Sequence, residues 1–195
     1  MKKDLSIFKR TCKYYVNDSQ SKLMFSVNIF GEEYTVYANS AVVFLSKQPI
    51  KEIEEGIADF NLQYNQFKGK FEETNANKNK NFIEQIMNTF SFDNHDNWHK
   101  FTSNQIDNYL SYLDEEYKEN KKTYGTKAHL YSNNPYCIEG EKNIWVNPMF
   151  AKCAFDFVGN TEEVYLFGTL KPILFINSEM NRMALVLPVV RNRNV

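Results

Sequence analysis

Two histidines four residues apart form the arrangement in this sequence that most resembles a metal site. His95 and His99 lie in one segment with Asp93 and Asp96, and this spacing places two imidazoles on one face of a helix, where they can bind zinc. The sequence contains no His-Glu-x-x-His motif, and the remaining histidine, His129, is distant. The Asn and Asp residues of the segment disfavour a long helix. We therefore predict a polar surface loop without a metal; an enzyme built around these histidines is the alternative.

Acidic pairs occur in the middle of the chain, but they do not predict catalysis. They adjoin apolar residues at helical spacing, which is typical of solvated helix faces. The sequence has no glycine-rich phosphate loop, no nucleophile elbow and no Cys–His pair at a recognisable spacing. We therefore predict a protein that is not an enzyme and carries no cofactor. The acidic pairs are Glu54–Glu55, Glu72–Glu73 and Glu115–Glu116.

The three cysteines, Cys12, Cys137 and Cys153, form no close pair. An odd number without metal-ligand spacing is typical of buried free thiols in a reducing compartment. No apolar segment follows the first three residues, and no apolar run reaches membrane-spanning length. We therefore predict a cytoplasmic protein without membrane contact.

The composition limits how this chain can bind nucleic acid. Its 195 residues are 43% hydrophobic and 24% charged, which predicts one globular domain with or without an elaboration. The formal net charge is −1, whereas proteins that bind DNA through its phosphates usually carry a basic excess or a basic patch. Contact with DNA would therefore require a local patch of cations.

The first predicted helix begins at Leu5, with Asp4 as its N-cap. Leu5, Phe8, Cys12 and Tyr15 recur at helical spacing and form one apolar stripe. The remaining surface of this helix is basic, so it suits either a solvated position or contact with a nucleic-acid backbone. Its cations are Lys2, Lys9, Arg10 and Lys13.

Three strands are predicted after this helix. Residues 22–30 and 34–38 alternate between apolar and polar side chains around Gly31, which predicts a hairpin. Residues 41–45 form a short, continuous apolar run, which is typical of a buried strand.

The middle of the chain has a helical character. We predict a long helix with an aromatic face over residues 52–73, a polar loop over 75–81 and a short helix over 82–90. Thr102–Ser103 can cap a further helix, and a highly charged stretch from Tyr117 onward ends at Gly125. Aromatic residues at helical spacing usually form core, and an exposed face for a partner is the alternative. Short strands are predicted at residues 129–131 and 136–138.

The last part of the sequence predicts one helix followed by three strands. Asn147 is a good N-cap, Pro148 suits the first helical position and Gly159 is a natural stop. The polar side of this helix carries Lys152 but also Asp156. Apolar runs at residues 163–167, 171–176 and 183–190 predict the strands.

The order of these C-terminal pieces resembles the closing segment of a bacterial sliding clamp, the β-subunit-type DNA processivity factor. A fainter match lies at residues 37–44, where clamp domains carry a Thr-Asp-Gly-His-Arg-Leu-Ala turn; here the Gly, His and Arg are absent. The matching C-terminal segments are Val146–Pro148, Val158–Gly159, Glu162–Leu166, Leu170–Leu174 and Leu185–Arg191.

The resemblance implies an α+β fold, a DNA-clamp-like domain in which antiparallel sheets carry two helices on one face. One clamp domain consists of two copies of a helix-plus-strands half. Residues 1–49 would form the first half, residues 50–130 a helical insertion and residues 131–195 the second half.

The resemblance also implies a function, that of a sliding-clamp-like DNA replication accessory encoded by a phage or mobile element. Such a processivity factor is a homo-oligomer that encircles double-stranded DNA without reading its sequence. Lys2, Lys9, Arg10, Lys13 and Lys152 would touch the DNA phosphates. The alternative is a clamp-derived protein-interaction module that does not encircle DNA, which the near-neutral net charge favours.

The end of the chain is the predicted partner-binding site. In the clamp family this end helps to wall an apolar groove that accepts short peptides from a DNA polymerase or another replication protein. The alternative is a last sheet strand whose inner residues are simply buried. The residues that would wall the groove are Leu187, Pro188, Val189, Val190 and Arg191.

Overall fold

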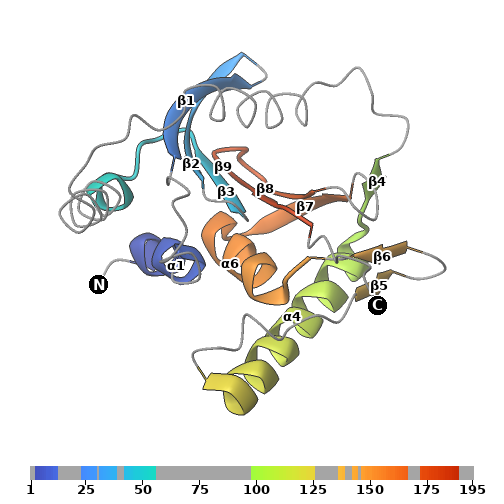
Figure 1. Cartoon of the computed structure of the whole chain (residues 1–195). Helices are drawn as coiled ribbons and strands as arrows, with labels where there is room; N and C mark the ends of the chain where they lie inside the picture. The colour runs from blue at the N-terminus through green and yellow to red at the C-terminus, as the bar shows by residue number, and fades with distance from the viewer. Residues whose placement is uncertain are drawn as a thin grey trace, which may run out of the picture.

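A computed structural model describes most of the chain in separate stretches (Figure 1). The described residues are 3–12, 23–29, 31–38, 42–55, 98–125, 136–138, 142–144, 146–166 and 172–188. The predictions at residues 75–81, 82–90 and 129–131, and most of the helix predicted over 52–73, lie outside them.

The main sheet is built from two segments of the same design, each a helix followed by three strands. The first half comprises α1 (Lys3–Cys12), β1 (Leu23–Ile29), β2 (Glu32–Ala38) and β3 (Val42–Ser46). The second comprises α6 (Pro148–Val158), β7 (Thr161–Leu166), β8 (Ile173–Asn177) and β9 (Arg182–Val186).

The two halves join at the centre of one seven-stranded antiparallel sheet. Its strand order is β1-β2-β3-β9-β8-β7-β4, so the last strand of each half pairs with the last strand of the other. In this pair Val42 lies opposite Val186 and Ser46 opposite Arg182. Counted outward from this central antiparallel pair, the strands of each half follow the same order. The two halves are therefore related by an approximate two-fold axis. The fold is therefore α+β, as predicted, with the two halves sharing one sheet.

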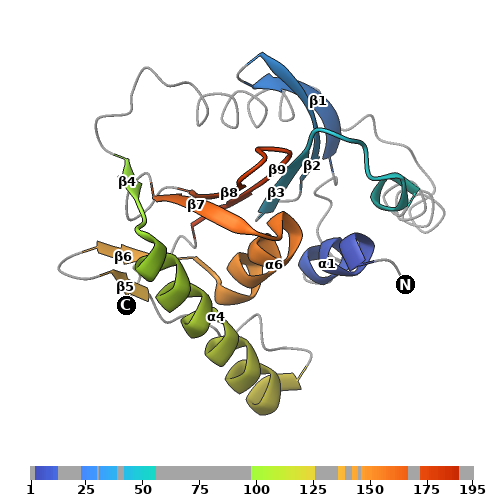
Figure 2. The same cartoon turned by 180° about the vertical axis from the view of Figure 1, so that it is seen from behind.

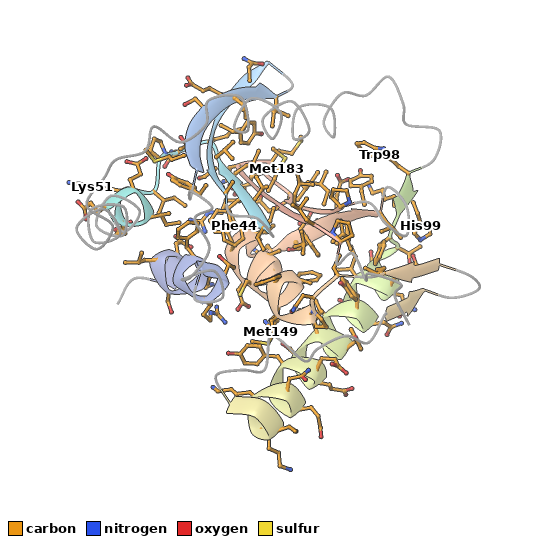
Figure 3. All side chains as sticks on the ribbon, viewed as in Figure 1. Phe44, Lys51, Trp98, His99, Met149 and Met183 are labelled. Carbon is orange, nitrogen blue, oxygen red and sulfur yellow. The ribbon has the colours of Figure 1, made fainter. Side chains whose placement is uncertain are left out.

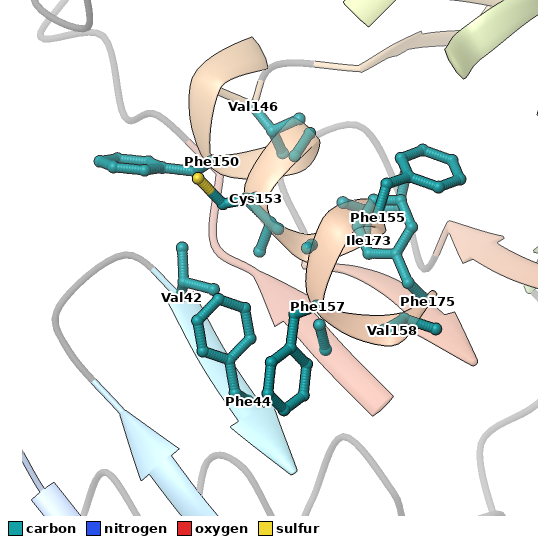
Figure 4. Packing of buried hydrophobic residues seen from close by; sticks show 14 of the residues in the cluster. Val42, Phe44, Val146, Phe150, Cys153, Phe155, Phe157, Val158, Ile173 and Phe175 are labelled. Carbon is teal, nitrogen blue, oxygen red and sulfur yellow. The ribbon is translucent and has the colours of Figure 1, made fainter. Parts of the chain in front are cut away.

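Both helices pack on the same face of this sheet, side by side (Figures 1 and 2). Phe44 of β3 lies between them. Its ring is 6.3 Å from the ring of Phe8 on α1. It also stacks 4.3 Å from the ring of Phe157 on α6, and Figure 4 shows these two rings next to each other. Since neighbouring strand residues point to opposite faces, Val43 and Leu45 belong to a second buried cluster on the other face. The sheet is thus apolar on both sides.

The predicted end signals of α6 are confirmed. The Asn147 side chain accepts a hydrogen bond from the Met149 backbone N–H at 2.9 Å, and Pro148 occupies the first turn. Gly159 ends the helix with a positive φ of 75°, a conformation that glycine adopts without steric cost.

The start of α1 differs from the prediction. Asp4 is not the N-cap, because the helix already includes Lys3. Its carboxylate instead accepts two hydrogen bonds from Arg182 at the start of β9, at 2.9 and 3.0 Å. The buried face of α1 centres on Ile7 and Phe8, whereas Leu5 is only half-buried. The buried face of α1 is therefore rotated about the helix axis relative to the predicted apolar stripe, because α1 packs against α6.

The middle of the chain contributes α4 (Ser103–Tyr124) and the two-residue strand β4 (His99–Lys100). β4 adds an edge strand beside β7, in a stretch whose sequence predicted only irregular structure. The predicted start of α4 is confirmed, with Thr102 as N-cap. The helix continues through the charged stretch, and Gly125 follows its last turn. α4 packs along α6, so this part of the middle of the chain is joined to the second half.

A small hairpin of β5 (Tyr136–Ile138) and β6 (Lys142–Ile144) precedes α6, which confirms the strand predicted at 136–138. Among the described residues, Cys153 is a buried free thiol, as predicted. No helix in these stretches is both long and apolar enough to cross a membrane.

Candidate functional site

The outer side of α6 is the surface on which the clamp resemblance predicts DNA contact. All residues of α6 are buried except Lys152 and Asp156. The sheet covers one side of the helix, while α1 and α4 cover its flanks (Figures 1 and 2). Lys152 and Asp156 are one helical turn apart and therefore form a narrow polar strip between the flanking helices.

Four charged side chains from three helices meet at this strip. Arg10 of α1 lies 2.9 Å from Asp156. Lys152 lies 2.6 Å from Asp156 and 3.3 Å from Asp114 of α4. We call Arg10, Asp114, Lys152 and Asp156 the ion cluster. Its two cations and two carboxylates leave it without net charge.

The surroundings of the two cations favour their charged forms. Burial is the largest influence on the pKa of Arg10 and lowers it, but Coulombic interactions with Cys153 and Asp156, and hydrogen bonding with Asp156 and Tyr117, outweigh burial and raise the pKa. For Lys152 burial again lowers the pKa and the two carboxylates together raise it. Both cations are therefore paired within the protein at neutral pH.

Only part of the predicted DNA-binding set can be located. Arg10 and Lys152 come together in the ion cluster, on two helices that are far apart in sequence. Lys9 lies in α1, and its side chain is outside the described part, as are Lys2 and Lys13. In the described part of this face, the predicted DNA-binding cations already hold carboxylates.

The predicted partner-binding groove is located only at its beginning. Leu187 and Pro188 follow the end of β9 and are half-buried. Pro188 forms an isolated antiparallel bridge with Val146, just before α6. Val189, Val190 and Arg191 lie outside the described residues.

The histidine pair is divided between described and undescribed chain. His99 lies in β4, and its ring is 5.6 Å from that of Phe101 (Figure 3). Its Nε2 is the one buried side-chain polar atom without a hydrogen-bond partner in the stretches the structure describes. His95 is outside them, and those stretches contain no group of three or more His, Cys, Asp or Glu residues that could hold a metal ion.

Comparison with family models, curated proteins and solved structures finds no match to this chain. The geometry of the chain itself therefore carries the functional argument.

Sequence reasoning missed the residues of α4 that complete the site. Asp114 lies next to the Glu115–Glu116 pair that was expected on a solvated face, but it pairs with Lys152. Tyr117 contributes to the raised pKa of Arg10. The Lys152–Asp156 pair has a local signal, since oppositely charged residues at i, i+4 meet on a helix. The contacts from α4 depend on tertiary packing and leave no such signal.

Proposed function

We propose that this protein is a non-enzymatic, sliding-clamp-like DNA replication accessory. The observation that carries the proposal is the pairing of two helix-plus-three-strand halves through β3 and β9, with α1 and α6 together on one face. Two helix-plus-strands halves with both helices on one face are the features that the resemblance implies for one clamp domain. The two described halves make up one such domain, and a ring that encircles DNA is then an assembly of several of them.

In this function the protein stays on DNA because it surrounds the duplex, and its cations attract the phosphates only weakly. A ring of subunits holds the duplex while cations on the inner helices touch the phosphates without reading bases. Such contacts release counterions from DNA, so the binding constant falls steeply as salt rises. The polymerase or another replication protein then attaches at the chain end that begins with Leu187 and Pro188.

The first test is the mass of the protein in solution, by light scattering coupled to size-exclusion chromatography. A multimer large enough to close a ring is the expected result. The second is binding to duplex DNA across a salt series, where affinity should decrease linearly on a log–log scale. A monomer that does not bind duplex DNA at low salt would overturn the proposal.

The second candidate is a clamp-derived protein-interaction module that does not encircle DNA. The ion cluster favours it, because Arg10 and Lys152 are already paired with carboxylates. In this case the protein is a monomer or dimer, and it does not bind duplex DNA at any salt concentration of the series. The same two measurements therefore separate the two functions.

A further inference from the structure

We propose that α4 is an internal competitor of DNA: its Asp114 occupies the phosphate-binding position of Lys152, so that DNA binds only by displacing it. This inference rests on the proposed function and adds a means of regulation to the same site. It assigns a role to a helix from the insertion, which lies beside the two clamp-like halves.

The distances within the ion cluster support competition. Carboxylate and phosphate oxygens bind ammonium and guanidinium groups at similar distances and with similar geometry. The Asp114 and Asp156 oxygens lie 3.3 and 2.6 Å from the Lys152 Nζ. They therefore occupy the positions that phosphate oxygens would take.

The packing of α4 keeps this competitor in place. Leu113, next to Asp114 in sequence, is fully buried, as is Tyr109 one turn earlier. The Tyr109 ring lies 6.1 Å from that of Phe155 on α6. An anchored carboxylate acts at a high effective concentration because it need not diffuse to its partner. Phosphate must therefore compete with it on every encounter.

The competitor can also be released without unfolding α4. The Asp114 side chain is 44% exposed, whereas that of Lys152 is 18% exposed. Rotation of Asp114 into solvent frees one contact of Lys152 and leaves the buried residues of the helix in place. Exposed ion pairs are weak, so a polyanion with several contacts can displace this one.

The test compares duplex DNA binding by the full-length wild type, Asp114→Asn and Glu115→Gln across a salt series. Glu115→Gln is the matched control. Glu115 is the exposed neighbour of Asp114 on α4, and its substitution removes the same charge. We expect Asp114→Asn to bind about twofold to fivefold more tightly at low salt. Glu115→Gln should stay close to the wild type.

A second variant identifies the cation. Lys152→Met in the Asp114→Asn background should abolish the gain in affinity, while the aliphatic stem preserves packing; thermal unfolding checks that each variant is folded. If wild type, Asp114→Asn and Glu115→Gln bind duplex DNA equally, the competition is overturned and the proposed function stands. If none of them binds at low salt and all are monomers, the proposed function is overturned, and the competition with it.

Discussion

Single side chains connect the two ends of the chain. Arg182, at the start of β9, donates two hydrogen bonds to Asp4 on α1 and a third, at 3.0 Å, to the Phe157 carbonyl on α6. Its guanidinium also lies 5.1 Å from the centre of the Phe157 ring. One residue thus fixes both helices of the domain to the final hairpin.

Replacement of Arg182 by Met should lower the free energy of unfolding by about 1–3 kcal/mol, because the Asp4 carboxylate loses its charged partner. Arg182→Lys should recover only part of this loss, since an ammonium group cannot form the two parallel bonds. Urea unfolding measures both values. Lys51→Met, at an exposed cation, is the control and should change stability by less than about 0.5 kcal/mol. Equal stabilities for all three variants would refute this role of Arg182.

Tyr37 forms a second connection at the level of one residue. Its hydroxyl accepts a hydrogen bond from the Ile50 backbone N–H at 2.5 Å and donates one to Glu54 at 3.2 Å. Tyr37 is fully buried. The bond fixes β2 to the short helical segment at residues 51–55.

Tyr37→Phe should cost about 1–3 kcal/mol at neutral pH because it leaves the Ile50 N–H unsatisfied. Burial, with Glu54, raises the pKa of Tyr37 from 10.0 to about 12 against the opposing Ile50 bond. The unfolded chain therefore loses this proton first, and the contribution of Tyr37 to stability is complete below pH 10 and is lost as the pH rises toward 12.

The measurement is the unfolding free energy of wild type and Tyr37→Phe as a function of pH. The wild-type advantage should shrink between these two pH values and should be constant at lower, near-neutral pH. A difference that stays constant into the alkaline range would contradict the assignment of the shifted pKa to Tyr37.

Sequence patterns reveal residues whose partners are local, and miss those whose partners are distant. Asn147 and Thr102 were identified as caps because a cap bonds within its own first turn. Asp4 was misread as a cap because an acidic residue before an apolar stripe gives the same signal. Its true partner, Arg182, comes from the opposite end of the chain.

At the scale of elements, α4 carries its own start signal. Thr102 and Gln105 form a capping box, in which the Gln105 N–H donates to the Thr102 hydroxyl at 3.3 Å and the Thr102 N–H donates to the Gln105 side chain at 2.9 Å. These two bonds satisfy donors that the first helical turn leaves free. The helix therefore begins at a fixed residue beside β4.

Thr102→Ala should destabilise the protein by about 1 kcal/mol through loss of this cap. Hydrogen exchange at the Ile106 amide, which bonds to the Thr102 carbonyl at 3.0 Å, should accelerate. Thr102→Ser keeps the hydroxyl and should restore protection. Ser103→Ala changes the adjacent exposed residue and should have little effect. Unaltered exchange in Thr102→Ala would mean that packing on α6 alone determines where the helix starts.

Periodicity predicts the elements of each half, but not the contacts of the insertion. The apolar alternation of β1 and β2 and the continuous runs of β3 and β8 follow from which faces are buried. β4 has two residues, too few for any period to appear. Its position depends on pairing with β7, where His99 lies opposite Leu166.

At the scale of the whole molecule, the two halves should unfold as one unit. Phe44 in β3 stacks on Phe157 of the other half, and β3 pairs with β9 along five residue pairs. Neither half can lose its structure without exposing the apolar surface of the other. Cooperative unfolding is expected when the core is shared in this way.

Phe44→Ala should reduce the unfolding free energy by about 3–5 kcal/mol, the usual cost of truncating a buried phenylalanine. A single transition in urea should persist for wild type and variant when followed by both fluorescence and circular dichroism. Met24→Ala, at a side chain that is 49% exposed on β1, is the control and should stay within about 0.5 kcal/mol. Two separate transitions would show that the halves are independent.

The helix and three strands of each half were predictable from the sequence patterns, whereas the division into two halves came from the clamp resemblance. The single shared sheet was not predictable, since the pairing of β3 with β9 joins residues near opposite ends of the chain. Periodicity reports which face of a strand is buried and carries no information about its neighbours across such a separation.

The central position of β9 has a consequence for synthesis on the ribosome. β3 is made early, but its partner strand is encoded near the end of the chain. At translation rates of about 5–20 residues per second, β3 waits on the order of ten seconds with one edge unpaired. Unpaired apolar strands recruit other chains. The nascent protein should therefore need a chaperone at the exit tunnel, and slowing of translation between β3 and β9 should increase aggregation.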